Sequence, residues 1–351
     1  MISDKQFQNR LLTWFDQHGR KHLPWQQNKT AYRVWISEIM LQQTQVNTVI
    51  PYYQRFMQRF PDLSSLAQAE PDEVLHLWAG LGYYSRARNL HRAAQLIMQN
   101  HQGEFPASLA ILQKLPGIGQ STAGAILALA FNQPAAILDG NVKRVLARFH
   151  GITDFINEKS VENRLWELAA HYTPKKCVAD YTQAMMDLGA TLCIRGKPAC
   201  ERCPLSEDCL ARQQNIAALL PRKKAARELA VRTATFVVFK MQASILLHKR
   251  PDKGIWGGLW SLPEFAGEPE KKRIQIFCRE QLQVKINDYQ ILETFRHSFT
   301  HYHLDIFPIL IPLKKKPPVA IEDSAQIWYN LQQPKAIGLP KPIQSIVRNL
   351  S

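Results

Sequence analysis

The residues Leu115-Pro116-Gly117-Ile118-Gly119 come directly before an apolar run that ends at Phe131, and they set how the first part of this chain folds. One helical pattern ends near Lys114 and a second helix is expected to begin at Gln120 or Ser121, so the two glycines predict a tight turn between helices. Backbone N–H groups at the start of the second helix would favour an anion such as a phosphate. An ordinary helix corner would use the same residues.

The pattern around this turn divides the chain into three parts. Apolar residues recur at intervals of three and four, which predicts an all-α region over 1–212. A more polar and basic stretch at 213–231 predicts a linker. Short β-rich segments then predict a mixed α+β domain over 232–351; these segments are 233–240, 244–248 and 304–311.

Composition limits the class of protein. The chain has 351 residues, 46% of them hydrophobic, and a formal net charge of +15. A chain of this size can bury a core and form two or three domains. The positive charge makes nucleic acid the leading partner, although a generic basic protein would have the same charge.

The first residues carry an acid at Asp4 and no apolar core, so we expect no signal peptide and a cytoplasmic protein. The longest apolar run, 122–131, is far shorter than the ~20 residues of a membrane span. We therefore expect no membrane association.

Four of the six cysteines form a C-x6-C-x2-C-x5-C motif. They are Cys193, Cys200, Cys203 and Cys209. Such clustering in a cytoplasmic chain predicts a metal site rather than disulfides. Four thiolates could bind an iron–sulfur cluster or zinc, but structural zinc more often uses two Cys-x2-Cys pairs and only one is present. The two other cysteines, Cys177 and Cys278, are expected to be buried thiols.

Two acidic residues are candidates for catalysis. Glu38 follows Val34 by four and precedes Leu41 by three, which places it on the apolar stripe of a helix. Partial burial would raise the pKa of Glu38, which suits a proton donor, but a structural glutamate paired with an arginine would fit the same pattern. Asp139 precedes a helical pattern and, taken alone, is best explained as a helix N-cap.

Five segments in order strengthen the catalytic interpretation. They are LPWQ at 23–26, SEIMLQQTQV at 37–46, GLGYYSRARNL at 80–90, LPGIGQSTAGAI at 115–126 and LDGNVKRVLAR at 138–148. This set resembles the MutY family of adenine DNA glycosylases, which belongs with the helix-hairpin-helix enzymes related to endonuclease III. The resemblance covers nearly the whole chain and implies double-stranded DNA with A:8-oxoguanine or A:G mispairs as substrate.

By this resemblance, Glu38 would protonate the flipped adenine and Asp139 would stabilise the positive charge on the deoxyribose. Asn141 would help to hold the site. The hairpin glycines, Gly117 and Gly119, would grip the DNA backbone without reading its sequence. The resemblance also implies a [4Fe-4S] cluster at the four cysteines.

Further residues refine the expected reaction. Related enzymes that also cut the strand carry a lysine where this chain has Ser121, so we expect base removal without an efficient strand-cleaving step. Ser121 would also serve as a plain N-cap. Gln42, Gln43 and Tyr83 are the family's candidates for extruding the adenine and filling the gap.

The C-terminal domain resembles the Nudix proteins at Trp256–Pro263. Gln283 and Val284 stand where paired magnesium-binding acids would follow Arg279-Glu280, so we expect a reader rather than a hydrolase. In the MutY family a Phe-Ser-His loop contacts 8-oxoguanine; the matching residues are Phe299, Thr300 and His301. Alternatively, Phe299 packs in the core and His297, His301 and His303 lie on one face of a strand.

Four functions are compatible with parts of this sequence. The leading one is an adenine glycosylase, expected to be a monomer that associates with the bacterial nucleoid during repair. A thymine or oxidised-pyrimidine glycosylase is disfavoured by Ser121 and the C-terminal domain. A nucleotide-pool hydrolase lacks its acidic helix, and a non-enzymatic iron–sulfur DNA clamp has no use for Glu38 and Asp139 facing a polyanion.

Overall fold

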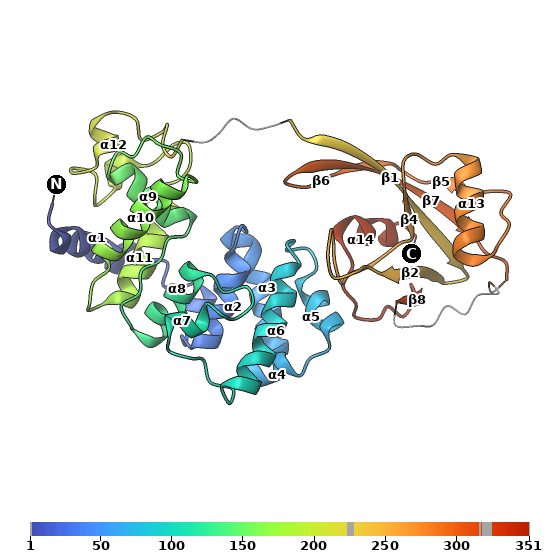
Figure 1. The fold of residues 1–351 in the computed structure, drawn as a ribbon, viewed down its shortest axis with the longest axis horizontal. Coiled ribbons are helices and arrows are strands. Elements are labelled where there is room, and N and C mark those ends of the chain that lie inside the picture. The colour runs from blue at the N-terminus through green and yellow to red at the C-terminus, as the bar shows by residue number, and fades with distance from the viewer. Residues whose placement is uncertain (1, 223–227, 316, 318–324, 351) are drawn as a thin grey trace. The chain divides into compact units, whose positions relative to one another are not determined.

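The computed structural model describes residues 2–222, 228–315, 317 and 325–350 (Figure 1). The chain forms two compact units. The first comprises Met1–Gln68 and Asn89–Ala225, and the second comprises Ala69–Arg88 and Ala226–Ser351. Part of the predicted linker, residues 223–227, lies outside the described residues.

The first unit is helical and contains no strand among its described residues, which confirms the all-α expectation. Side-chain caps begin several of its helices, including Ser3 and Asp62. Its α-helices are α1 (Asp4–His18), α2 (Ala31–Leu41), α3 (Val46–Arg59), α4 (Leu63–Ala67), most of α6 (Ser85–Asn100), α7 (Leu109–Leu112), α8 (Gln120–Phe131), α9 (Gly140–Phe149), α10 (Lys159–Tyr172), α11 (Val178–Thr191) and α12 (Leu210–Gln213). Two 3-10 turns, η1 (Pro24–Gln26) and η2 (Cys200–Arg202), complete it.

The second unit is built on a mixed sheet. Its strands are β1 (Ala230–Met241), β2 (Ser244–Lys249), β3 (Trp260–Ser261), β4 (Glu264–Ala266), β5 (Gln290–Ile291), β6 (Phe295–Ser298), β7 (Tyr302–Pro312) and β8 (Gln326–Asn330). The central order is β3-β2-β1-β7-β5, with β4 on β1, β6 on β7 and β8 on β2. β1 and β7 run parallel, from Ala230 opposite Tyr302 to Lys240 opposite Pro312, and the other pairs are antiparallel.

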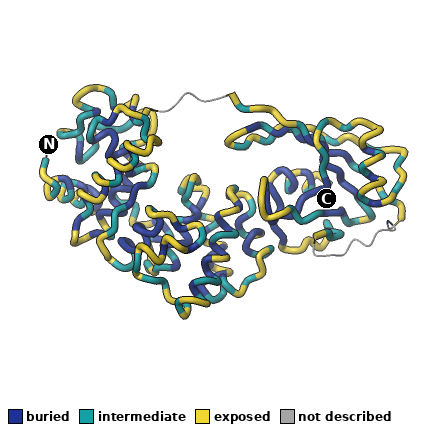
Figure 2. The backbone as a smooth tube through the Cα atoms, in the orientation of Figure 1, coloured by how far each residue is buried: buried dark blue, intermediate teal, exposed yellow. Residues whose placement is uncertain are grey.

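All three predicted β-rich segments fall within β1, β2 and β7, which confirms the mixed α+β expectation. Helix α13 (Lys271–Leu282) covers one face of the sheet, where Ile274 and Cys278 pack with Val237 and Ile309. Helix α14 (Lys341–Arg348) buries Ile343 and Ile346. In Figure 2 the central strands of this unit are largely dark blue, the colour of buried residues.

The second unit also includes a segment from the helical part of the sequence, with α5 (Pro71–Trp78). The Trp260 indole nitrogen donates to Asp72 Oδ2 at 3.0 Å, and Lys249 Nζ lies 2.9 Å from Asp72 Oδ1. His76 Nδ1 lies 3.1 Å from the Ile337 carbonyl oxygen. These contacts explain why residues 69–88 group with the C-terminal domain.

No helix within the described ranges is long and apolar enough to cross a membrane. The described residues therefore give no candidate membrane span.

Candidate active site and DNA-contacting elements

Glu38 lies on α2, which begins after Thr30 caps the Arg33 N–H at 3.2 Å. Its helical neighbours, including Val34 and Ile39, are buried, whereas Glu38 itself keeps partial access to solvent. Burial of its carboxyl group raises the pKa of Glu38 from 4.5 to about 8, and the charge of Asp139 adds to this increase. A carboxylic acid in this environment holds its proton at neutral pH.

Asp139 is the N-cap of α9, as expected from its type and position. Its Oδ1 accepts hydrogen bonds from the N–H groups of Asn141 at 3.0 Å and Val142 at 2.8 Å. The side-chain amide of Asn141 donates to Oδ2 at 3.0 Å. Burial raises the pKa of Asp139, and these three hydrogen bonds oppose that increase because they stabilise the carboxylate.

The two carboxyl groups therefore act as a pair. The charge of Asp139 raises the pKa of Glu38, and three donors to Asp139 favour its ionised form over that of Glu38. Environments that separate two carboxyl groups in this way give one proton donor and one anion. This arrangement suits a reaction in which a leaving group needs a proton while positive charge develops beside it.

Two residues behind Asp139 were missed by the sequence reasoning. Arg144 Nη2 donates to Asn141 Oδ1 at 2.8 Å and its Nε donates to the Cys193 carbonyl at 2.7 Å. Gly189 packs directly against Asn141, because an added Cβ would lie 2.5 Å from Asn141 Cβ and 2.9 Å from its Cα. The available signal was an arginine on the buried side of an amphipathic helix; Arg144 is 5% exposed.

The predicted hairpin joins α7 to α8, and α8 begins at Gln120 as expected. Gly117 has φ of 79°, a left-handed conformation that favours glycine, and Gly119 is the N-cap of α8. Ser121 is therefore not the N-cap. Its Oγ instead accepts a hydrogen bond from the Leu138 N–H at 3.1 Å, which fixes the residue before Asp139 against the hairpin helix.

The three residues expected to extrude the adenine occupy turns. Gln42 ends α2, and its side-chain amide lies 3.4 Å from the Thr122 hydroxyl of α8. Gln43 is exposed with φ of 57°. Tyr83, in the second unit, has φ of 50° and 41% exposure, and the Arg86 guanidinium lies 5.4 Å from its ring centre.

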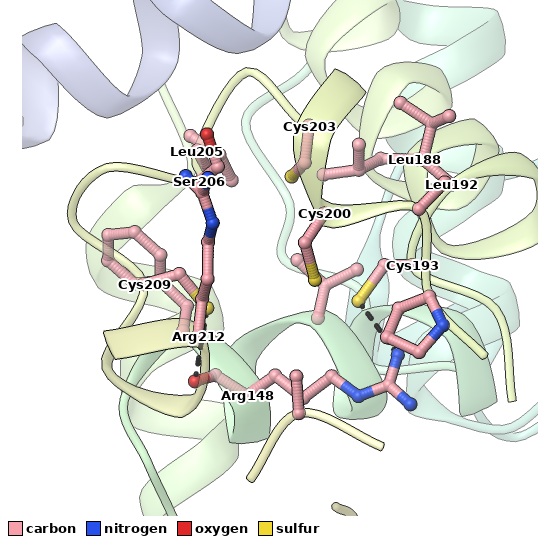
Figure 3. Close-up of a pocket in the computed structure, with 15 residues that line it drawn as sticks. Arg148, Leu188, Leu192, Cys193, Cys200, Cys203, Leu205, Ser206, Cys209 and Arg212 are labelled. Atoms are coloured by element: carbon pink, nitrogen blue, oxygen red, sulfur yellow. Dashed lines mark hydrogen bonds between the residues drawn. The ribbon is translucent and has the colours of Figure 1, made fainter. Parts of the chain in front are cut away.

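The four cysteines of the C-x6-C-x2-C-x5-C motif line one cavity of about 410 Å³, part of it open to solvent (Figure 3). No group of three or more histidine, cysteine, aspartate or glutamate side chains in the described ranges is placed to hold a metal ion. Burial raises the pKa of Cys203 to about 12 and raises those of Cys200 and Cys209. Metal binding here would release thiol protons, because thiolates are the ligands.

A buried arginine borders this cavity. Arg148 Nη1 lies 3.2 Å from Cys193 Sγ and donates to the Ile194 carbonyl at 2.8 Å, while Nε donates to the Leu220 carbonyl at 2.9 Å (Figure 3). Its Nη2 is buried without a hydrogen-bond partner within the described part of the chain. A buried guanidinium beside four thiols fits an anionic thiolate-bound group in the cavity.

The other two cysteines differ from one another. Cys278 is buried in the core of the second unit, as expected. Cys177 is exposed at the N-cap of α11 with φ of 54°, so the expectation of a buried thiol was wrong for this residue. It lies beside the exposed Lys175 and Lys176 in the turn before the helix, and Val178 is the first buried residue of α11.

The expected reading residues form the turn between β6 and β7. Phe299 stacks on Tyr302 at 4.7 Å between ring centres, and Thr300 and His301 are exposed at the tip. The alternative with three histidines on one strand face was wrong, because His297 lies on β6, His301 in the turn and His303 on β7. These histidines are an even number of positions apart, as on one face of a strand, but the chain reverses direction between them.

Helix α13 carries Arg279-Glu280, the pair expected to match the start of a Nudix acidic helix. It ends at Leu282, and Gln283 follows in a left-handed conformation with φ of 55°. Gln283 and Val284, the residues expected in place of the paired acids, therefore lie beyond the end of this helix.

Two family models match the chain. Residues 36–171 match the HhH-GPD superfamily base excision DNA repair proteins, and residues 234–349 match the NUDIX domain. The first range spans Glu38, the hairpin and Asp139, and the second spans the sheet of the second unit.

Comparison with known proteins gives full-length similarity. The adenine DNA glycosylase of Buchnera aphidicola subsp. Acyrthosiphon pisum is 42% identical over 98% of this chain and 97% of its own length. The adenine DNA glycosylase of Rattus norvegicus is 33% identical over 97% of this chain and 77% of its own length. Among solved structures, a thermostable thymine-DNA glycosylase superposes with a TM-score of 0.55 and 28% identity, covering 60% of this chain and 97% of that one.

Proposed function

This chain belongs to the family of adenine DNA glycosylases, and we propose that it removes adenine paired with 8-oxoguanine or guanine in double-stranded DNA. It is a DNA glycosylase of base-excision repair. The observation that carries the specific proposal is the carboxyl pair, in which burial and Asp139 raise the pKa of Glu38 to about 8. One group holds a proton at neutral pH while the other is stabilised as an anion.

We propose that Glu38 donates its proton to the flipped adenine as the N-glycosidic bond breaks. Asp139 then stabilises the positive charge that develops on the deoxyribose. Asn141 supports this role because its side-chain amide and backbone N–H both donate to Asp139. The bond broken joins adenine to the sugar, and water completes the hydrolysis.

The reaction stops at base removal in this proposal. Ser121 stands where strand-cutting relatives carry a lysine, and its hydroxyl already accepts the Leu138 N–H at 3.1 Å. A serine hydroxyl lacks the amine needed to form a Schiff base with the sugar. We therefore expect an abasic site and intact strands as the product.

The hairpin between α7 and α8 would hold the DNA backbone, and the turns that carry Gln42, Gln43 and Tyr83 would insert into the duplex. Gly117 and Gly119 allow the first N–H groups of α8 to face a phosphate. Gln42, Gln43 and Tyr83 would extrude the adenine and occupy its place in the stack. The 41% exposure and left-handed backbone of Tyr83 support this role, because a projecting aromatic side chain can enter a duplex.

We propose that Cys193, Cys200, Cys203 and Cys209 hold a [4Fe-4S] cluster. The four thiols line one cavity, and their spacing contains only one Cys-x2-Cys pair, which favours a cluster over one zinc ion. Such a cluster would cross-link the loop that carries these cysteines and can exchange electrons. The loop also carries Arg195, Lys197 and Arg202, whose charges would then face DNA.

Phe299, Thr300 and His301 are proposed to contact the base opposite the adenine. The Thr300 hydroxyl and the His301 ring both lie exposed at the tip of a hairpin, where they can donate or accept hydrogen bonds. Since the substrate is chromosomal DNA, we place the protein in the bacterial cytoplasm at the nucleoid. It would act as a monomer, because a mispair offers no two-fold symmetry.

A panel of duplexes tests this function. The protein, purified with its cofactor, is incubated with adenine opposite 8-oxoguanine, guanine, cytosine or thymine, and abasic sites are then cleaved with alkali. We expect excision opposite 8-oxoguanine and guanine, and strands that stay intact until alkali is added. Removal of thymine or an oxidised pyrimidine instead would contradict the proposal, as would strand breaks without alkali.

A further inference from the structure

The loop between β2 and β3, residues 251–259, has a tightly determined shape. Trp256 has φ of 55°, a left-handed conformation that is unusual for a bulky side chain, and is only 8% exposed. The next residue must be glycine, because a Cβ at Gly257 would lie 2.2 Å from the Asp252 carbonyl oxygen. Backbone strain of this kind persists where surrounding contacts hold it in place.

Trp256 forms one wall of the reading turn. Its ring centre lies 5.5 Å from that of Phe299 and 5.8 Å from that of His297, and the Arg250 guanidinium lies 5.5 Å from its ring centre. Phe299 contacts Tyr302 as well, at 4.7 Å. The first residue of the turn, Phe299, therefore packs in a cluster of rings that includes Trp256, Tyr302 and His297, and the position of Trp256 influences where the exposed tip of the turn lies.

Arg88 binds this loop from α6, within the same unit. Its Nη2 donates to the Asp252 carbonyl at 2.9 Å and its Nη1 donates to the Gly257 carbonyl. A guanidinium fits two carbonyl acceptors at once, which lysine cannot do with comparable geometry. These two bonds flank Trp256 in the sequence, so they hold the ends of the segment that carries it.

In the sequence, Arg88 comes five residues after Tyr83, which lies in an exposed turn. The Tyr83 carbonyl accepts the Arg86 N–H at 2.9 Å, and the Arg88 N–H donates to the Tyr84 carbonyl at 3.2 Å. The segment that ends in Arg88 therefore links Tyr83 to the loop of Trp256. Both surfaces proposed to contact DNA in this unit depend on that segment.

We propose that Arg88 and Trp256 are positioning residues for recognition of the opposite base. Arg88 fixes the loop of residues 251–259, and Trp256 in that loop fixes Phe299 and the Thr300-His301 tip. This inference rests on the proposed function, since it assigns a purpose to contacts within the reading unit. A purely structural role would instead lower stability and slow excision equally on every mispair.

The test compares Arg88→Met with Arg92→Met, which removes the same charge from an exposed position one turn further along α6. Single-turnover adenine excision is measured opposite 8-oxoguanine and opposite guanine, and the ratio of the two rates is the readout. We expect Arg88→Met and Trp256→Leu to lower this ratio about tenfold, the equivalent of losing one or two hydrogen bonds. Arg88→Lys should lose less, and Arg92→Met should leave the ratio unchanged.

Thr300→Ala/His301→Ala separates failure of this inference from failure of the proposed function. If that double variant lowers the ratio and Arg88→Met does not, the positioning role is wrong and the reading turn stands. If the double variant keeps the ratio, the reading turn itself is wrong. Thermal unfolding is measured in parallel, and an equal loss on both mispairs with a lower melting temperature would mean that Arg88 is only a structural tether.

Discussion

The carboxyl site and the reading turn are built in opposite ways. Asp139 accepts three hydrogen bonds from residues within three positions of it, and Glu38 lies on a helix whose other core-facing residues are buried. Thr300 and His301 lie exposed on a hairpin tip, and the turn is held by packing of the Phe299 ring. The first site therefore holds two carboxyl groups in defined positions. In the second, only Phe299, at the start of the turn, is held by packing, and the tip is exposed.

This difference indicates a division of labour. Two buried carboxyl groups, one protonated and one stabilised by three hydrogen bonds, set how fast a glycosidic bond breaks, because they act on the reacting atoms. An exposed turn held by rings can adjust to a base edge, so it sets which mispair is preferred. The comparison predicts that changes at the first site alter rate and changes at the second alter selectivity.

The largest effect is expected from Glu38→Gln, which removes the proton and keeps the shape. Adenine excision should fall by roughly 10²- to 10⁴-fold, the usual contribution of a general acid. The loss should be the same opposite 8-oxoguanine and guanine, with duplex binding retained. Single-turnover rates and a binding titration measure this, with Glu104→Gln, exposed in the same unit, as the control. A loss confined to one mispair would contradict the view that the carboxyl site sets the rate and the reading turn sets the selectivity.

A smaller effect is expected from pH. Because Glu38 must be protonated and its pKa is about 8, kcat/KM should be retained below that value and fall about tenfold per unit above it. Protonation of Asp139, whose pKa is also raised, should reduce the rate at the acidic end. The ratio between the two mispairs should stay flat across the alkaline fall. A rate that keeps rising above pH 9 would exclude Glu38 as the acid.

The last expected effect is on stability. The raised pKa of Glu38 means that the folded state binds more protons than the unfolded chain between pH 4.5 and about 8, so stability falls as pH rises through that window. Glu38→Gln should therefore stabilise the protein at pH 9, by at most about 5 kcal/mol for a shift of this size, and have no effect at pH 4. Urea unfolding at both pH values measures it; equal stability at pH 9 would mean that the carboxyl group is not strained by burial.

The sequence predicts the first site better than the second. Asp139 and its donors are close neighbours along the chain, so a cap motif at a helix start was sufficient to place them. Helical periodicity placed Glu38 on α2. The reading turn was ambiguous, because histidines at 297, 301 and 303 fit one strand as well as a hairpin.

Contacts between distant residues could not be predicted. Trp260 and Asp72 are 188 positions apart, and Arg88 binds backbone carbonyls, which any residue type supplies. No pattern in the sequence therefore shows that residues 69–88 group with the C-terminal domain. The raised pKa of Glu38 is also set by distant residues: it depends first on the residues that bury the carboxyl group and then on the charge of Asp139, at the start of α9.

Gly189 gives the carboxyl site a vulnerability that its chemistry does not reveal. Any side chain there would push against the Cβ and backbone of Asn141, and the backbone cannot yield without moving the donors to Asp139. Inherited variation at this glycine should consequently resemble loss of the carboxylate itself. Harmful mutations in such a repair gene are therefore not limited to the residues that react. They also include replacements of a glycine that has no side chain of its own.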